Sequence, residues 1–204
     1  MPLPSAAAPH ALDAPCALHA LRYGRVAMAL HWLLALMITA SFSLGLYMAD
    51  LPFTVMRLRL YNWHKWAGVV ILSLSAFRLL WRVAHRPPPL GERVEAAMPR
   101  WQRAAHHATL CAMYILFFGV PLAGWAYTSA RGYPVVWFGV LALPDFVPRD
   151  PAWADALLPL HRYGAYGLAG LVLLHVAAVA KHHWIDRDGL AGRMFPSPRK
   201  KAVK

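Results

Sequence analysis

Four histidines lie in or beside long apolar segments, and their type and spacing could do chemistry. His64 in "YNWHKWAGV" and His161 in "PLHRYGAYG" each stand next to a cation at the mouth of such a segment, whereas His31 and His175 lie further inside. Polar side chains at such depth are costly and are usually functional. Imidazole nitrogen is a common ligand of haem iron and of other transition metals. The four histidines are therefore candidate metal ligands.

Helical spacing places these histidines at two levels. His31 follows Arg25 by six residues and His175 precedes Lys181 by six, so each lies about 9 Å inside the same cationic end. His161 and His175 are 14 residues apart. That separation returns to within about 40° of the starting direction, about 21 Å further along the axis. One helix face therefore presents an imidazole at each of two depths.

His31 and His64 complete a pair with His175 and His161, respectively. We call the pair His31 and His175 the inner level, and the pair His64 and His161 the outer level. Two imidazoles on separate helices can take both axial positions of a haem iron, with the porphyrin edge-on between the helices. Zinc or copper is the competing interpretation, but zinc usually binds three or four protein ligands. For any single histidine the alternative is a hydrogen-bonded packing role, and the matched levels favour two haems.

Two further residues are candidates for contact with a cofactor. Arg78 follows His64 by 14 residues, which puts it about 21 Å along the helix, near the inner level. A guanidinium there could bind a haem propionate, and the alternative is that it snorkels to the headgroups. His106 and His107 open the third apolar segment. Interfacial polarity explains both, and a contact of His107 with a propionate or a quinone is the functional alternative.

The cysteines indicate how a haem would be held. Cys16 and Cys111 are far apart and belong to no CxxCH haem-attachment motif. The haems are therefore predicted to be non-covalent. The sequence also contains no flavin or nicotinamide fingerprint, so a hydride donor would need a partner protein.

The elements that must position these residues are membrane helices. Hydrophobic residues make up 59% of the chain and charged residues 15%, against about 45–50% and 25% in soluble domains. Four apolar segments have roughly the 20 residues needed to cross a bilayer. The sequence predicts an all-α, integral membrane four-helix bundle. The expected helices are about 26–48, 63–83, 105–129 and 160–184.

The segments outside these helices complete the domain organisation. Residues 1–21 are rich in Ala and Pro and lack the pattern of a signal peptide, so they are predicted to be a disordered tail. Residues 22–196 form the transmembrane domain, and residues 197–204 form a basic tail. Prolines and charges mark the segment from about 130 to 159 as a connection.

The positive charge predicts the orientation of the helices. The 21 Lys and Arg outnumber nine acidic residues. Such a balance can indicate nucleic-acid binding, but basic loops that orient membrane helices explain it better. Both tails, the connection between the second and third helices, and the adjoining helix ends hold most of these cations. The positive-inside rule therefore places both termini in the cytoplasm.

Several motifs in order resemble the bacterial cytochrome b561 family over about residues 22–196. They are "RYGRVAMALHWLLALMI", "YNWHKWAGVVILSLSAFRLLWR", "FFGVPLAGW" and "PLHRYGAYGLAGLVLLHVAAVAKHHWIDRDGLAGRMFP". The resemblance implies four helices in the bacterial inner membrane and two b-type haems, with ligands at positions matched here by His31, His64, His161 and His175. It also implies electron exchange with quinone, and a superoxide-oxidising, quinone-reducing activity occurs in the family.

Three functions are compatible with these features. The leading one is a di-haem electron carrier between a periplasmic one-electron donor, with superoxide as the candidate, and ubiquinone. Arg57, Arg59 and Lys65 could attract such an anion to the outer level, or could be ordinary flanking anchors. The alternative is a haem-bearing anchor subunit of a respiratory dehydrogenase or hydrogenase, docked through residues 131–159. A haem-free transporter with relay histidines is the third.

Overall fold

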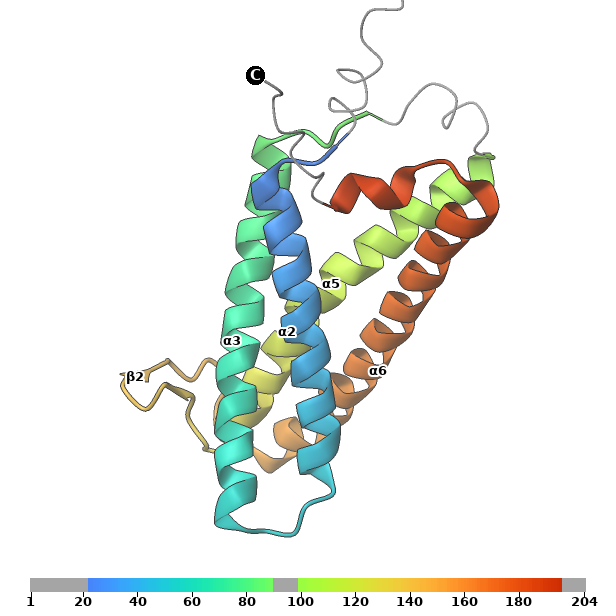
Figure 1. Cartoon of the computed structure of the whole chain (residues 1–204). Helices are drawn as coiled ribbons and strands as arrows, with labels where there is room; N and C mark the ends of the chain where they lie inside the picture. Colours follow the sequence, from blue (N-terminus) through green and yellow to red (C-terminus); the bar gives the residue numbers. More distant parts are fainter. Residues whose placement is uncertain (1–21, 90–98, 196–204) are drawn as a thin grey trace, which may run out of the picture.

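The structure is a computed structural model that describes residues 22–89 and 99–195. These residues form four long helices (Figure 1), which are α2 (Arg25–Ala49), α3 (Val55–Ala84), α5 (Arg100–Ala130) and α6 (Pro151–Lys181). A short antiparallel hairpin, β1 (Val136–Trp137) and β2 (Leu141–Ala142), lies between α5 and α6. After α6 come a π-helical turn, η1 (His182–Asp186), and a 3-10 turn, η2 (Leu190–Met194).

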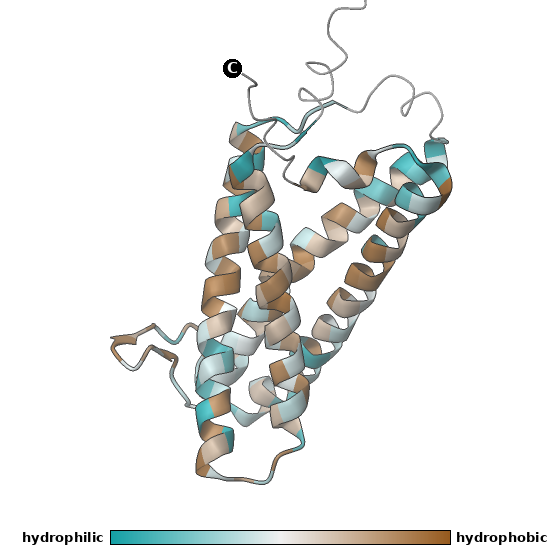
Figure 2. Ribbon diagram, viewed as in Figure 1, coloured by the Kyte–Doolittle hydropathy of each residue, from teal (hydrophilic) through white to brown (hydrophobic). Residues whose placement is uncertain are grey.

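All four helices are long and apolar enough to cross a membrane. Their membrane-compatible segments have 25, 30, 31 and 36 residues, the last including η1. Large apolar side chains such as Leu36, Leu80 and Leu173 are more than half exposed, as expected for surfaces that face lipid. The middle of the helices is hydrophobic in Figure 2 and polar residues gather toward the helix ends. The predicted class, an all-α integral membrane protein, is confirmed.

The first three predicted spans lie inside the observed helices, and the fourth runs past the end of α6 into η1. Helix α3 begins earlier than expected. It starts at Val55 because the Thr54 hydroxyl accepts a hydrogen bond from the Arg57 backbone N–H (3.3 Å). This contact satisfies one of the unpaired N–H groups at the helix start. Arg57 and Arg59 lie in this first part of α3, which can extend beyond the bilayer.

Helix α6 also begins earlier than the predicted span, so the last part of the predicted connection, from residue 151 onward, is helical. The Asp150 carboxylate accepts the Ala152 N–H at 2.7 Å, and Pro151 occupies the first turn. Both features favour a helix start. Pro159 lies inside the helix. It removes only one backbone hydrogen bond, which does not outweigh the strong start.

The helices pack as two antiparallel pairs. Helix α2 packs against α3 and α5 against α6, while α3 also contacts α5. Small residues on α5, including Ala123 and Ala126, are buried and allow close helix approach. We call the end where α2 and α5 start the upper end, as drawn in Figure 1. The lower end is the one with the α2–α3 and α5–α6 connections.

The turns after α6 fold back over the upper end, where η2 lies near the start of α2 (Figure 1). The Trp32 indole N–H donates to the Met194 carbonyl at 2.9 Å, and its ring lies 5.2 Å from that of Phe195. Trp32 is adjacent to His31, so these turns help to cover the inner level. The predicted tails, 1–21 and 197–204, lie outside the described residues.

Candidate haem sites

The structure brings both predicted histidine pairs together. The ring centroids of His31 and His175 are 6.3 Å apart, with an interplanar angle of 72°. Those of His64 and His161 are 6.0 Å apart, at 89°. All four residues are half-buried. Helix α6 supplies one member of each pair, and the partners come from α2 at the inner level and α3 at the outer level.

These separations leave room for one metal ion to be held by the two imidazoles of each level. A metal–imidazole bond is about 2 Å long, and each ring centre lies about 1 Å beyond its nitrogen. Two imidazoles trans to one metal therefore have centroids about 6 Å apart. Each level offers two imidazoles, which suits haem better than the three or four ligands of a typical zinc site.

Hydrogen bonds at the outer level leave the Nε2 atoms available. His161 Nδ1 lies 2.8 Å from the Val120 carbonyl oxygen. A carbonyl only accepts, so Nδ1 carries the proton and Nε2 is free to bind metal. His64 Nδ1 lies 3.2 Å from the Ser41 hydroxyl, which can accept from it in the same way. Such contacts orient ligand imidazoles and fix their tautomers.

Two glycines make room for the outer imidazoles, and the sequence analysis missed both. A Cβ on Gly45 would stand 3.3 Å from His64 Cε1, and one on Gly124 would stand 2.9 Å from His161 Cε1 and Nδ1. Gly164 has a different role, because its Cβ would meet Val120 Cγ2 at 3.1 Å. It lets α6 approach α5 beside the carbonyl that holds His161.

The outer pair lines a cavity near the lower end of the bundle. Phe42, Val69 and Leu72 contribute apolar walls, while Lys65 and Arg162 bring positive charge. Apolar walls with a few charged groups suit a flat macrocycle that carries propionates.

The cations predicted near the outer level differ in their hydrogen-bond partners and in their exposure. Arg57 donates to the Leu51 carbonyl at 2.7 Å and to the Ala49 carbonyl at 3.4 Å, which caps the end of α2. Lys65 donates to a loop carbonyl at 3.3 Å. Arg59 is exposed, so it is better placed than Arg57 to act on an approaching anion.

At the inner level, Arg78 contacts a ligand candidate directly. Its Nη1 lies 3.0 Å from His31 Nδ1. A guanidinium can only donate, so Nδ1 must accept and the proton of a neutral ring is on Nε2. Binding metal through Nε2 needs the opposite tautomer. Arg78 and a metal at Nε2 therefore compete for His31, and ligation would require Arg78 to turn away.

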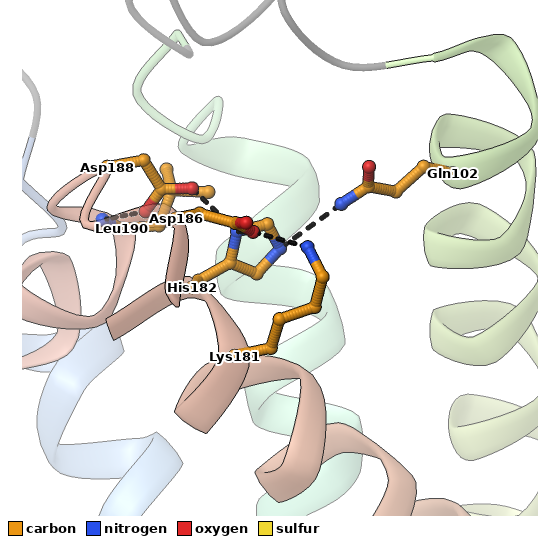
Figure 3. A network of polar contacts seen from close by, with 6 residues as sticks. All are labelled: Gln102, Lys181, His182, Asp186, Asp188 and Leu190. Atoms are coloured by element: carbon orange, nitrogen blue, oxygen red, sulfur yellow. Dashed lines mark hydrogen bonds and ion pairs between the residues drawn. The ribbon is translucent and has the colours of Figure 1, made fainter. Parts of the chain in front are cut away.

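His107 lies apart from the inner pair's described contacts. It is exposed, and its ring contacts that of His106 at 5.7 Å. Gln102, about one turn earlier on α5, reaches across instead to His182 at 3.5 Å (Figure 3).

A polar network that sequence reasoning did not single out surrounds His182 (Figure 3). Its Nδ1 lies 2.6 Å from an Asp188 oxygen and 3.2 Å from Asp186, which also pairs with Lys181 at 2.6 Å. His182, Asp186 and Asp188 are the one group of three side chains in the described residues that could hold a metal ion. The contacts of His182 with both carboxylates and the ion pair between Lys181 and Asp186 tie the π-helical turn to the residues beside it.

The comparison with known families decides the identity. The model of the prokaryotic cytochrome b561 family matches residues 22–197. The chain belongs to the prokaryotic cytochrome b561 family.

Curated relatives of this cytochrome b561 agree over most of their length. It is 33% identical over 183 residues to cytochrome b561 homolog 2 of Escherichia coli K12, covering 85% of this chain and 91% of the relative. It is 25% identical to the probable superoxide oxidase CybB of Yersinia pestis, covering 87% and 98%. It is also 26% identical to cytochrome b561 homolog 1 of E. coli K12, covering 86% and 97%.

Membership confirms the resemblance seen in the motifs and makes this cytochrome b561 a multi-pass protein of the bacterial inner membrane that takes part in electron transfer. It also implies a b-type haem. The residues present fit such a group, because each level has two facing imidazoles and the outer level has a free Nε2 on His161 with a glycine beside each ring.

Proposed function

We propose that this cytochrome b561 binds two b-type haems and carries electrons from a periplasmic one-electron donor, with superoxide as the candidate, to ubiquinone. The observation that carries the proposal is the presence of two facing histidine pairs, set 14 residues apart along α6. That spacing corresponds to about 21 Å along the axis. The name of the Yersinia relative, a probable superoxide oxidase, supports the choice of donor.

The protein and the cofactor have separate tasks in this proposal. Haem supplies one-electron chemistry when it is bound. His31 and His175 hold the inner haem, and His64 and His161 hold the outer one. Val120 and Ser41 keep the outer imidazoles in position through their Nδ1 atoms. The apolar helices exclude water from both levels.

Two more residues have roles toward the haems. Arg78, once it leaves His31, is within reach of the inner level and supplies the positive charge for a propionate there. His107, near the upper end of α5, remains a prediction for a propionate or quinone contact. Both roles depend on the inner haem being present.

The lower end, with the outer level, faces the periplasm in this proposal, and both termini are cytoplasmic. The support is the distribution of Lys and Arg toward the upper end. A green fluorescent protein fused after residue 204 should then fluoresce, and an alkaline phosphatase fused there should be inactive. The reverse pattern would contradict this orientation.

The donor and the acceptor are tested together by stopped-flow spectroscopy. Each superoxide gives up one electron and leaves as dioxygen, and ubiquinone takes two electrons and two protons. Superoxide should reduce the purified haem protein, and added ubiquinone should reoxidise it. No reduction by superoxide, or no reoxidation by ubiquinone, would contradict the proposal and favour an anchor subunit that copurifies with a dehydrogenase.

Ionic strength adds a second readout to the same experiment. The Debye length shrinks from about 30 Å at 0.01 M salt to about 10 Å at 0.1 M. If surface cations steer the anion, reduction should slow over this range and slow further in Arg59→Glu. The control is Arg86→Glu, a charge at the upper end. Equal rates in both variants would exclude steering by Arg59.

A further inference from the structure

The hairpin between α5 and α6 carries an exposed apolar tip, residues 137–141. It projects sideways from the bundle beside α3 (Figure 1), and much of it is hydrophobic in Figure 2. Phe138 is 59% exposed, Val140 89% and Leu141 53%. Phe138 packs on one side against Trp66 of α3, but more than half of each of the three side chains stays exposed.

The base of the hairpin is fixed to α3. The Trp66 indole N–H donates to the Val136 carbonyl at 2.7 Å, and Lys65 Nζ donates to the Pro134 carbonyl at 3.3 Å. Between these contacts, Val135 is only 2% exposed and lines the cavity of the outer level. Val135, the residue before β1, is therefore part of the wall of that cavity, and the hairpin is held at the level of Lys65 and Trp66.

This level is not the outermost part of the molecule. Helix α3 begins at Val55, ten residues before Lys65, so it extends about 15 Å further outward. The apolar span predicted from sequence begins close to Lys65, at residue 63. The hairpin thus projects where α3 passes from lipid to water, and not into the aqueous space beyond.

The aromatic residues at this level are of the kinds found at membrane interfaces. The Phe138 ring lies 5.0 Å from that of Trp66 and 4.9 Å from that of Trp137. Tryptophans are enriched where a membrane helix crosses the headgroup region. The tip continues this cluster outward from α3, so lipid is the surface it would meet first.

The turn itself carries an unusual residue. Phe138 has φ +48° and Gly139 has φ +75°, and the Val140 N–H donates to the Trp137 carbonyl at 3.0 Å. A β-turn whose two central residues both have positive φ favours Asn, Asp or Gly at these positions. A bulky residue with positive φ is a conformational outlier. Phenylalanine is therefore poorly suited to the turn, and contact of its ring with lipid would offset that cost.

We propose that residues 137–141 are an interfacial lipid anchor, inserted among the headgroups and upper acyl chains at the lower end of the bundle. The anchor would hold Val135 in the wall of the outer cavity. The partner is the bilayer and not a second copy of the chain, because the tip is continuous with the lipid-facing surface of α3 at the same level. The inference does not depend on haem.

The test measures the depth of the tip in lipid vesicles. A chain carrying Cys16→Ser and Cys111→Ser receives a single cysteine, Val140→Cys, labelled with an environment-sensitive fluorophore. The matched control is Phe53→Cys, because Phe53 is 81% exposed and lies in the α2–α3 connection, beyond the level of the hairpin. Quenching by lipids brominated near the headgroup is compared with quenching by aqueous iodide.

The label at 140 should be quenched severalfold more by brominated lipid than the label at 53, and severalfold less by iodide. Equal iodide quenching at the two positions would overturn the proposal. Protection of position 140 from both quenchers, relieved by diluting the protein in lipid, would indicate a second copy and would also overturn it.

A second variant separates lipid contact from hairpin folding. Asparagine suits the positive φ at position 138, so Phe138→Asn should keep the turn but remove an anchoring ring. Iodide quenching of the label at 140 should then rise. An unchanged value would contradict an anchoring role for Phe138. None of these readouts uses haem or superoxide, so their failure is distinct from failure of the proposed function.

Discussion

At the residue scale, the residues that would hold or adjoin the haems recur at a spacing of 14 along the same helix. The four histidines could be predicted from the sequence because an imidazole in an apolar segment stands out. The glycines could not, since the role of a missing side chain is visible only when another helix brings a ring against it. The 14-residue pairs are His31 and Gly45 on α2, His64 and Arg78 on α3, and His161 and His175 on α6.

The first prediction concerns Gly124. In Gly124→Ala, the new Cβ would stand 2.9 Å from the His161 ring, closer than atoms in a folded protein tolerate. The ring should be displaced and the outer haem lost or altered, as measured by reduced-minus-oxidised spectra and haem content. Gly119→Ala on the same helix is the control, because nothing lies within 4 Å of its Cβ position. Matching spectra for the two variants would contradict the packing argument.

The second prediction concerns Arg78. If it pairs with a propionate, Arg78→Leu removes a positive charge near the inner haem, which favours the oxidised iron. The midpoint potential of the inner haem should fall, or its occupancy should drop, while the outer haem keeps its potential in a redox titration. Arg82→Leu, one turn further along α3, should change neither haem. An unaltered titration in Arg78→Leu would leave Arg78 as a headgroup anchor.

At the element scale, hydropathy was enough to find all four helices but not to locate the residues at which α3 and α6 begin. The true starts of α3 and α6 depend on Thr54 and Asp150, whose side chains accept backbone N–H groups in polar segments. A search for apolar runs stops before reaching such caps. The hairpin was missed as a strand pair because each strand has only two residues, too few for an alternating pattern.

The third prediction concerns the lower end of α2. Arg57→Ala removes the donor to the Leu51 and Ala49 carbonyls. A hydrogen bond from a charged group contributes roughly 1.5–3 kcal/mol, so the free energy of unfolding in detergent should fall by about that amount. Arg59→Ala, an exposed neighbour, should stay within about 0.5 kcal/mol of the parent. A comparable loss in both variants would mean that general charge, not capping, matters.

At the scale of the whole molecule, α6 is the shared element, because it supplies one histidine to each level. A substitution of any one of the four histidines should therefore affect only the level to which that histidine belongs. The sequence predicted this arrangement from the 14-residue spacing on α6 and from the distance of each histidine to its nearest cation. It could not predict the network around His182, since those contacts depend on how the chain turns after α6 and meets α5.

The fourth prediction follows from that separation. His31→Ala should remove the inner haem and leave the outer spectral component, whereas His64→Ala should do the opposite. Low-temperature reduced-minus-oxidised spectra and redox titrations resolve the components. If both substitutions disturbed the same component, the assignment of the levels would be wrong.

The central claim, that two histidine pairs hold two non-covalent b-type haems, is tested most directly by counting haem per chain. The purified protein is assayed by pyridine haemochrome against protein concentration, before and after acid–acetone extraction. Two haems per chain, both released by extraction, are expected. One haem per chain, or haem that stays attached to the polypeptide, would contradict the account.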